Sequence, residues 1–236
     1  MRVLAILPAF NEARSLPGVL AALRLAAPEV DPCVVDDGST DGTAAVAAGL
    51  GATVLRIPVN LGIGGAVQAG YLHAREHGYE VAVQIDADGQ HDPASLPGLL
   101  APLRDGGADL VVGSRFLLDG GFRSTPLRRA GIRYLALCLR LRCGARVTDP
   151  TSGLRAAGRA AIQLFARRYP SDYPEPEAIA LARRAGLRVV EVPVRMAERA
   201  HGRSSITWAR SLYYLIKVSL ALLLLPARER PVRPTR

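Results

Sequence analysis

The first 115 residues alternate short apolar runs with segments of helical length, and no other feature constrains the fold as strongly. Such an order predicts a mostly parallel sheet with helices on both faces, which binds ligands at the carboxyl ends of its strands. We expect strands at residues 3–7, 33–36, 53–57, 81–85 and 110–112. We expect helices at residues 15–27, 43–50, 65–76 and 93–103.

The chain is organised differently after Arg115. The sequence there indicates a basic helix at 126–142, a polar turn at 148–153, helices near 158–166 and 175–185, a strand at 188–194 and a hydrophobic helix at 212–225. We therefore predict one α/β domain over residues 1–205, with halves at 1–115 and 116–205. A hydrophobic helix within 206–225 and a disordered basic tail over 226–236 follow it.

The composition is that of a globular domain without disulfides. With 236 residues and 49% hydrophobic content, the chain can bury a substantial core. Its cysteines, Cys33, Cys138 and Cys143, are odd in number and lack CxxC spacing, which is typical of reduced thiols in the cytosol. Pro8 interrupts the N-terminal apolar run too early for a signal peptide, so we expect no export.

The formal charge of +9 suggests an anionic partner. Lys217 is the only lysine among the 30 basic residues, so the many arginines can also reflect a compositional bias of the genome. Aromatic residues make up 5% of the chain and do not alternate with a basic stripe. We therefore expect an anionic membrane surface as a partner and no nucleic acid.

Two aspartates stand one residue apart where a predicted strand ends, in the segment QIDADGQHD at residues 84–92. Mg²⁺ and Mn²⁺ take oxygen ligands and hold diphosphates through one or two carboxylates. Asp86 and Asp88 therefore indicate metal-assisted chemistry on a nucleoside diphosphate. The alternative is a solvated acidic turn.

Three further polar loops follow predicted strands: PAFNE at 8–12, DDGSTDGT at 36–43 and NLGIGGA at 60–66. Their carboxylates suit nucleobase and ribose groups, and backbone N–H groups of the glycine-rich loop can approach a ligand. Helix capping by Asn11, Ser15, Ser39 or Asp41 is the structural alternative. The loops contain no GxGxxG fingerprint and no Walker A sequence.

Together with DADGQHDP and GSR at 113–115, these loops resemble the family 2 glycosyltransferases with the GT-A fold, within the polyprenyl-phosphate, or dolichyl-phosphate mannose synthase-like, branch. The resemblance covers about residues 1–225 and implies a GT-A Rossmann-like fold that binds a nucleoside diphosphate sugar. The donor residues that it implies are Pro8, Ala9, Asn11, Glu12, Asp37, Gly65, Asp86, Asp88, Gln90 and Arg203. Asp88, with Asp86 and Gln90, would hold Mg²⁺ or Mn²⁺ on the diphosphate.

The resemblance also implies an acceptor half that binds a polyprenyl phosphate. Its acceptor residues would be Arg115, Arg123, Arg129, Arg133, Ser152, Arg155 and Glu175, and its catalytic residues Asp88, Arg115, Asp149 and Glu177. Solvated surface is the alternative for Arg123, Arg128 and Arg133, and a structural turn the alternative for Asp149. Between the two glutamates of YPEPE at 173–177, we favour Glu177 as the sugar contact; either can be a general base for a hydroxyl acceptor.

Two apolar helices are candidates for membrane contact. Residues 212–225 reach about 21 Å as a helix, short of the roughly 30 Å hydrocarbon core, so we expect an interfacial helix. Residues 127–137 are a second candidate, and core packing is the alternative for both. We expect a peripheral enzyme on the cytoplasmic face of the cell membrane, with a separate membrane protein as a possible partner.

The sequence thus predicts a metal-dependent, inverting transfer of a hexosyl unit to a polyprenyl phosphate, in the making of a cell-envelope glycan. One alternative is an enzyme of the same fold with a glycan or small-molecule hydroxyl acceptor. From a different class comes a sugar-phosphate nucleotidylyltransferase, which would carry a GxGxRL-type loop where PAFNE stands. An inactive nucleotide-sugar-binding module is the third alternative.

Overall fold

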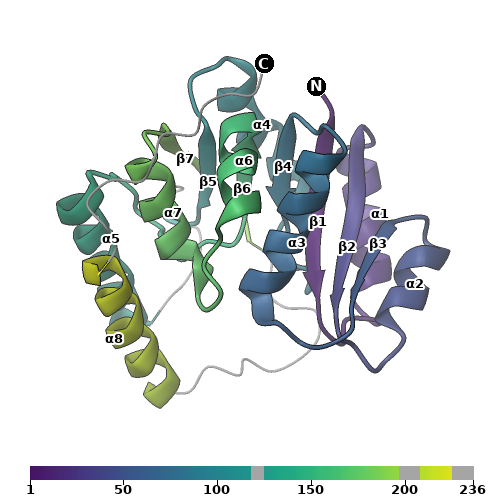
Figure 1. The fold of residues 1–236 in the computed structure, drawn as a ribbon, viewed down its shortest axis with the longest axis horizontal. Helices are drawn as coiled ribbons and strands as arrows, with labels where there is room; N and C mark the ends of the chain where they lie inside the picture. Colours follow the sequence, from purple (N-terminus) through teal and green to yellow (C-terminus); the bar gives the residue numbers. More distant parts are fainter. Residues whose placement is uncertain (118–124, 197–207, 225–236) are drawn as a thin grey trace.

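The computed structural model describes residues 1–117, 125–196 and 208–224, with only the backbone at 208–212 (Figure 1). Within these ranges seven strands form one sheet. They are β1 (Val3–Ala9), β2 (Val30–Asp37), β3 (Thr53–Ile57), β4 (Val81–Gln84), β5 (Leu110–Ser114), β6 (Arg155–Gly158) and β7 (Val189–Pro193). Their order is β3-β2-β1-β4-β6-β5-β7, and neighbours are parallel except where β6 is involved.

Helices cover both faces of this sheet. They are α1 (Leu16–Ala26), α2 (Thr43–Gly49), α3 (Gly62–Glu76), α4 (Leu96–Arg104), α5 (Pro126–Cys143), α6 (Arg159–Arg167), α7 (Pro174–Arg184) and α8 (Trp208–Leu224). Figure 1 shows α3 and α6 over one face. The predicted fold class, α/β with a mostly parallel sheet and helices on both faces, is confirmed, and the predicted elements are found within a few residues of their expected bounds.

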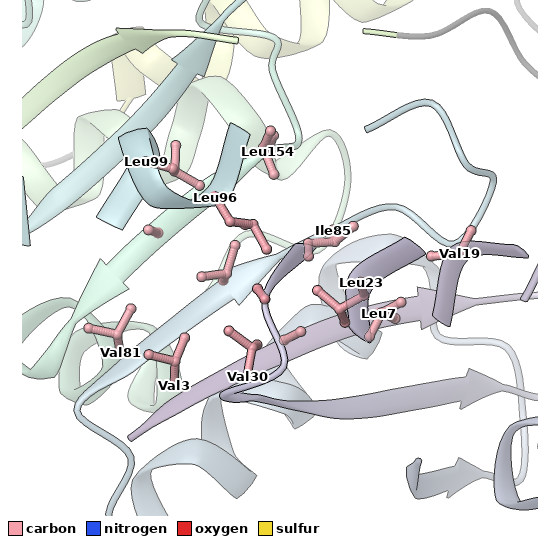
Figure 2. Packing of buried hydrophobic residues seen from close by; sticks show 14 of the residues in the cluster. Val3, Leu7, Val19, Leu23, Val30, Val81, Ile85, Leu96, Leu99 and Leu154 are labelled. Atoms are coloured by element: carbon pink, nitrogen blue, oxygen red, sulfur yellow. The ribbon is translucent and has the colours of Figure 1, made fainter. Parts of the chain in front are cut away.

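The core is divided by the sheet because successive strand residues point to opposite faces. Leu7 of β1 belongs to a cluster with Leu23 of α1 and Leu96 of α4, seen from close by in Figure 2. Ile6 belongs to the cluster on the other face, with Val67 of α3 and Phe165 of α6. The fully buried strands β1, β4 and β5 position the loops at their carboxyl ends.

Strand β6 was not predicted. It pairs antiparallel with β4 and β5, so the turn at residues 148–153 that precedes it lies at the carboxyl end of β4. Its four residues, RAAG, show no alternation, and the expected helix near Gly158 begins instead at Arg159. The pairing, with Arg155 opposite Gln84, is therefore a tertiary effect that local sequence does not encode.

Helices α5, α7 and α8 enclose a third cluster beside β5, which includes Leu135, Ile179 and Val218. Within the described part of the chain, no helix has the length and apolar character required to cross a membrane.

Gly64, in the first turn of α3, lies against the backbone of residues 170–171. A Cβ added there would overlap the carbonyl oxygens of Pro170 and Ser171 and lie 2.6 Å from the Ser171 carbonyl carbon. Because backbone atoms cannot move aside cheaply, only glycine fits this approach.

We expect Gly64→Ala to lower the free energy of unfolding by about 1–3 kcal/mol, the usual cost of overpacking. Gly98→Ala in α4 is the matched control, since a Cβ there meets nothing within 4 Å; it should leave stability unchanged or raise it by about 0.4–1 kcal/mol. Urea denaturation measures both. Equal stability of the two variants would contradict the close approach.

Candidate active site at the carboxyl edge of the sheet

Asn11 ties the loop after β1 to the loop after β2. Its Oδ1 accepts hydrogen bonds from the Thr40 N–H (2.9 Å) and the Thr40 hydroxyl (3.3 Å), and its own N–H donates to Ser39 Oγ (2.9 Å). Its φ of 58° is unusual for a residue other than glycine. Ser15 is the N-cap residue of α1 but its side chain makes no capping hydrogen bond, so the capping alternative does not explain this loop.

The remaining predicted residues of the first loop lie beside it. Pro8 and Ala9 are buried at the end of β1. The Glu12 N–H donates to Thr43 Oγ1 (2.9 Å), and the Ser15 hydroxyl donates to the Glu12 carboxylate. The first two loops therefore form one connected polar surface above β1 and β2.

Asp37, at the end of β2, is buried and binds the start of α3. Its Oδ1 accepts from the Leu61 N–H (2.8 Å) and its Oδ2 from the Gly62 N–H (2.9 Å). The Gly64 N–H donates to the Ser171 carbonyl (3.2 Å). The N–H groups of Leu61, Gly62 and Gly64 are thus bound within the protein. The expectation that N–H groups of the glycine-rich loop approach a ligand is therefore wrong for these three groups.

Packing also explains the glycine at Gly65. A Cβ there would lie 2.6 Å from the Leu61 Cβ. The donor-binding role of Gly65 stays a prediction.

The loop after β4 is held by His91, whose role was not predicted although it stands in the segment QIDADGQHD. The Asp86 N–H donates to His91 Nδ1 (3.0 Å), and His91 Nε2 lies 3.6 Å from Asp86 Oδ2. The imidazole is buried, whereas the Asp86 side chain is 35% exposed. Since Nδ1 accepts a hydrogen bond, the neutral ring carries its proton on Nε2, facing Asp86.

Asp88 lies on a hollow of about 540 Å³ between α1, the loop after β4 and the end of β7. Arg14, Gly89, His91 and Met196 also line it. A larger hollow of about 670 Å³ lies at the amino ends of the strands and contains none of the predicted site residues. The predicted residues therefore gather at the carboxyl edge, as expected for parallel strands.

Asp86, Asp88 and Gln90 supply oxygen atoms of the type that Mg²⁺ and Mn²⁺ bind. Asp88 Oδ1 accepts from the Gln90 N–H (3.0 Å), which folds the loop so that both acids stand at one end of β4. Among the described residues, no group of three or more His, Cys, Asp or Glu could hold a metal alone. Two carboxylates fit a cation that takes its other ligands from a diphosphate and water.

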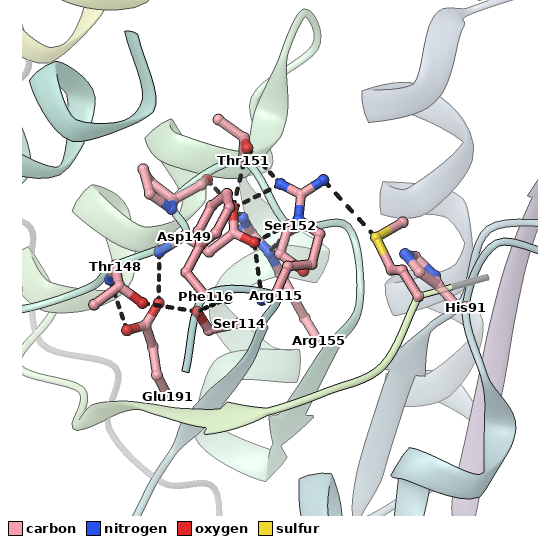
Figure 3. Close-up of polar contacts among 12 residues, drawn as sticks. His91, Ser114, Arg115, Phe116, Thr148, Asp149, Thr151, Ser152, Arg155 and Glu191 are labelled. Carbon is pink, nitrogen blue, oxygen red and sulfur yellow. Dashed lines mark hydrogen bonds and ion pairs between the residues drawn. The ribbon is translucent and has the colours of Figure 1, made fainter. Parts of the chain in front are cut away.

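Arg115 and Asp149 form a buried ion pair (Figure 3). Arg115 Nε donates to Asp149 Oδ2 (2.6 Å) and Nη2 to Oδ1 (2.7 Å), and the Arg115 backbone N–H also donates to Oδ2 (3.2 Å). Nη2 donates in addition to Thr151 Oγ1 (2.8 Å). These contacts give both residues a positioning role; their catalytic roles, and the binding of acceptor by Arg115, stay predictions.

Glu191 of β7 binds the same turn and was not predicted. Its carboxylate accepts from the Thr148 N–H (2.6 Å) and the Asp149 N–H (2.8 Å). Burial raises the pKa of the Glu191 carboxyl, and these two bonds partly offset the rise. The only signal in the sequence was an acid within an apolar strand.

Arg155 fixes the other end of the turn and is fully buried. Its Nε donates to the Ser152 carbonyl (2.8 Å) and its Nη2 to the Pro150 carbonyl (3.2 Å). These bonds support the turn, and the binding of an acceptor by Arg155 stays a prediction. The buried Ser152 stays a predicted acceptor residue, and Gly153 approaches Asp86 so closely that a Cβ would lie 3.1 Å from both carboxylate oxygens.

Glu175 and Glu177, in the first turn of α7, face different surroundings. Burial raises the pKa of the Glu175 carboxyl; Arg155 opposes the rise, and Asp86 adds to it. Burial also raises the pKa of Glu177, but the charges that act on it are those of Lys217, Asp172 and Arg168. Of the two, only Glu175 is affected by the charges of Asp86 and Arg155, and the roles of both glutamates stay predictions.

The other predicted arginines are on α5 or outside the described residues. The Arg129 guanidinium lies 4.3 Å from the centre of the Phe116 ring, next to Arg115. Arg128 and Arg133 are exposed on the same helix. Arg123 and Arg203 lie outside the residues that the structure describes.

Comparison with known proteins identifies the family. Residues 4–162 match the profile of Glycosyl transferase family 2. The chain belongs to this family. The resemblance drawn from its strand-end loops is confirmed.

Two curated relatives match along most of their length. The undecaprenyl-phosphate mannosyltransferase of Micrococcus luteus is 41% identical over 217 residues, covering 88% of each chain. The polyprenol monophosphomannose synthase of Mycolicibacterium smegmatis is 35% identical over 228 residues, covering 92% of this chain and 86% of that protein. The branch predicted from the sequence therefore agrees with these relatives.

A solved structure shares the fold of this family 2 chain. Glucosyl-3-phosphoglycerate synthase from Mycobacterium tuberculosis, in complex with Mg²⁺ and uridine diphosphate, aligns with a TM-score of 0.70 at 25% identity. The alignment covers 94% of this chain and 78% of that one. The predicted GT-A-like architecture is thereby confirmed.

Removal of the Asp149 carboxylate should leave the Arg115 charge buried without its partner. We expect Asp149→Ala to lower the free energy of unfolding by about 3–5 kcal/mol. Glu29→Ala is the control, because Glu29 pairs with Arg104 at the surface at 3.9 Å; its effect should stay below about 1 kcal/mol. Denaturant titration measures both. An equally small loss of unfolding free energy in the two variants would contradict a buried ion pair between Arg115 and Asp149.

Glu175→Gln should change how stability depends on pH. Because the folded state raises the pKa of Glu175, it holds that proton more tightly than the unfolded chain, and the stability associated with it is lost as pH rises through the folded pKa. The variant should therefore gain stability relative to the wild type between pH 4 and pH 7. Glu29→Gln, at an exposed site, is the control; parallel curves for Glu175→Gln and the wild type would contradict this expectation.

Proposed function

We propose that this family 2 glycosyltransferase moves one hexosyl unit from a nucleoside diphosphate sugar to a polyprenyl phosphate, with a divalent cation, at the cytoplasmic face of the membrane. The observation that carries the proposal is the contact between Gly153 and Asp86, where the turn at residues 148–153 meets the loop after β4. The donor-binding and acceptor-binding halves of the domain would thus be in contact beside Asp86. The names of both curated relatives support the acceptor class.

The donor would lie over the carboxyl ends of β1, β2 and β4. Asn11 and Glu12 belong to the connected loops above β1 and β2, and the partly exposed Asp86 stands beside them in the sheet order. Asp37 would support the nucleoside pocket by holding the start of α3 in place. Pocket shape would then depend on backbone bonds as well as on side chains.

Asp88, Asp86 and Gln90 would hold Mg²⁺ or Mn²⁺ at the diphosphate. A bound cation supplies Lewis-acid stabilisation of the negative charge that develops on the leaving diphosphate. His91 keeps Asp86 in place through its bond to the Asp86 N–H. The Mg²⁺ and uridine diphosphate in the solved relative support this choice of ligand.

A phosphate acceptor is already anionic near neutral pH and needs orientation more than deprotonation. Arg129 and Arg133 of α5 would provide positive charge for it, and Arg115 would act beside Asp149. Transfer would proceed with inversion and contribute to a cell-envelope glycan. The partly buried Glu175 near Asp86 favours a second candidate, in which a hydroxyl acceptor gives its proton to this carboxylate.

Transfer of radiolabelled mannose or glucose from GDP, UDP or dTDP sugars tests the acceptor class. With polyprenyl phosphate in detergent and Mg²⁺ present, we expect label to move into the organic phase. Omission of the lipid phosphate should abolish this transfer. Label that enters only a water-soluble acceptor would favour the second candidate and refute the first.

Asp88→Ala should lower kcat/KM by about 10²–10³, the scale of one lost electrostatic contact in the transition state. Asp105→Ala, at an exposed loop after α4, is the control and should keep full activity. Chelation with EDTA should stop transfer by the wild type, and Mg²⁺ or Mn²⁺ should restore it. Activity that survives EDTA would show that the cation is dispensable.

A further inference from the structure

Helices α5 and α8 expose matching apolar stripes. On α5 the stripe consists of Leu127, Ala130, Tyr134, Leu137 and Leu141, and on α8 of Tyr213, Ile216, Leu220 and Leu223. Both follow a spacing of three and four residues, which places their members on one side of a helix. Their large side chains are 47–81% exposed, although each helix also buries a separate face in the core beside β5.

The two helices pack in parallel. Gly131 lies against Leu215, where an added Cβ would be 3.5 Å from the leucine methyl groups. Further along, the Ser219 hydroxyl donates to the Tyr134 hydroxyl (3.1 Å), and Arg142 Nη2 donates to the Leu223 carbonyl (2.8 Å). The residue numbers of the contacting pairs increase along both helices, as expected for parallel helices. Tyr134, a member of the α5 stripe, also contacts α8. Figure 1 places the pair at the end of the molecule away from β3.

The charged side chains on the two helices are basic, and Lys217 of α8 pairs with Asp172 beside it. The sequences of α5 and α8 contain no Asp or Glu, and α5 carries five arginines, Arg128, Arg129, Arg133, Arg140 and Arg142. Arg140 is exposed between the stripe residues Leu137 and Leu141. An apolar stripe flanked by arginines fits a bilayer whose headgroups are anionic. A second copy of the chain would bring two basic surfaces together.

We propose that the α5–α8 pair is the docking surface for an anionic phospholipid bilayer, lying in the plane of the membrane interface. The stripe on α5 extends over about 21 Å, and such helices insert their apolar side by about 5–10 Å. Phe116, which contacts Arg129 of α5, places this surface next to Arg115 and the candidate acceptor site. The inference deepens the proposed function, because a lipid phosphate acceptor would be presented from that bilayer.

Vesicle co-sedimentation tests the surface without donor, metal or acceptor. We expect the full chain to bind phosphatidylglycerol-containing vesicles, to bind pure phosphatidylcholine vesicles more weakly, and to lose part of the difference at high salt. The double variant Leu137→Glu, Leu220→Glu should bind anionic vesicles at least about tenfold more weakly. Leu25→Glu is the matched control, since Leu25 is 89% exposed on α1, and it should bind like the wild type.

Charge is tested separately from apolar contact. Arg140→Glu should weaken binding to anionic vesicles by about tenfold and change binding to neutral vesicles little. Arg56→Glu on the exposed side of β3 should change neither. Circular dichroism melting should show all variants folded like the wild type, since every substituted side chain is exposed.

Three results would overturn the proposal. They are no binding of the wild type to anionic vesicles, unchanged binding of the double variant, and concentration-dependent self-association of the wild type that the double variant abolishes, which would assign the surface to a second copy. Because the assay contains no substrate, its failure is distinct from failure of sugar transfer in detergent.

Discussion

The buried ion pair between Arg115 and Asp149 is the contact on which the carboxyl edge of the sheet depends. Asp149 begins the turn that leads into the antiparallel strand β6, and a carboxylate removed from water requires a partner of opposite charge. Arg155 and Glu191 bind the backbone of the same turn. These contacts leave Gly153 against Asp86, so the 148–153 turn meets the loop after β4 at one carboxylate.

This arrangement separates residues that touch substrate from residues that hold the frame. Asp37, Arg155 and His91 bind groups of the protein itself, at the start of α3, in the 148–153 turn and at the Asp86 N–H. Asp86 and Asp88 remain partly exposed at the end of β4. A ligand at this edge would therefore meet Asp86 and Asp88, while the other three residues hold the loops in place.

The sequence predicted the first half well because strand alternation and strand-end loops are local signals. Strand β6 escaped prediction because its four residues become a strand only by pairing with β4 and β5. The partners of Arg115 and Arg155 also escaped, since a chain rich in arginine does not reveal which guanidinium is buried. Glu175 and Glu177 differ by about 200° around a helix, so a spacing pattern could not decide which one faces the site.

Crystals of the protein grown with Mn²⁺ and either UDP or GDP would test the donor site most directly. Anomalous scattering locates manganese independently of any assumption about the loop. We expect the peak at about 2.1 Å from an Asp88 carboxylate oxygen, the usual distance of small divalent cations, with the nucleoside over the ends of β1 and β2. A peak bound elsewhere, with Asp86 and Asp88 facing only solvent, would contradict the assignment of this edge as the site of sugar transfer.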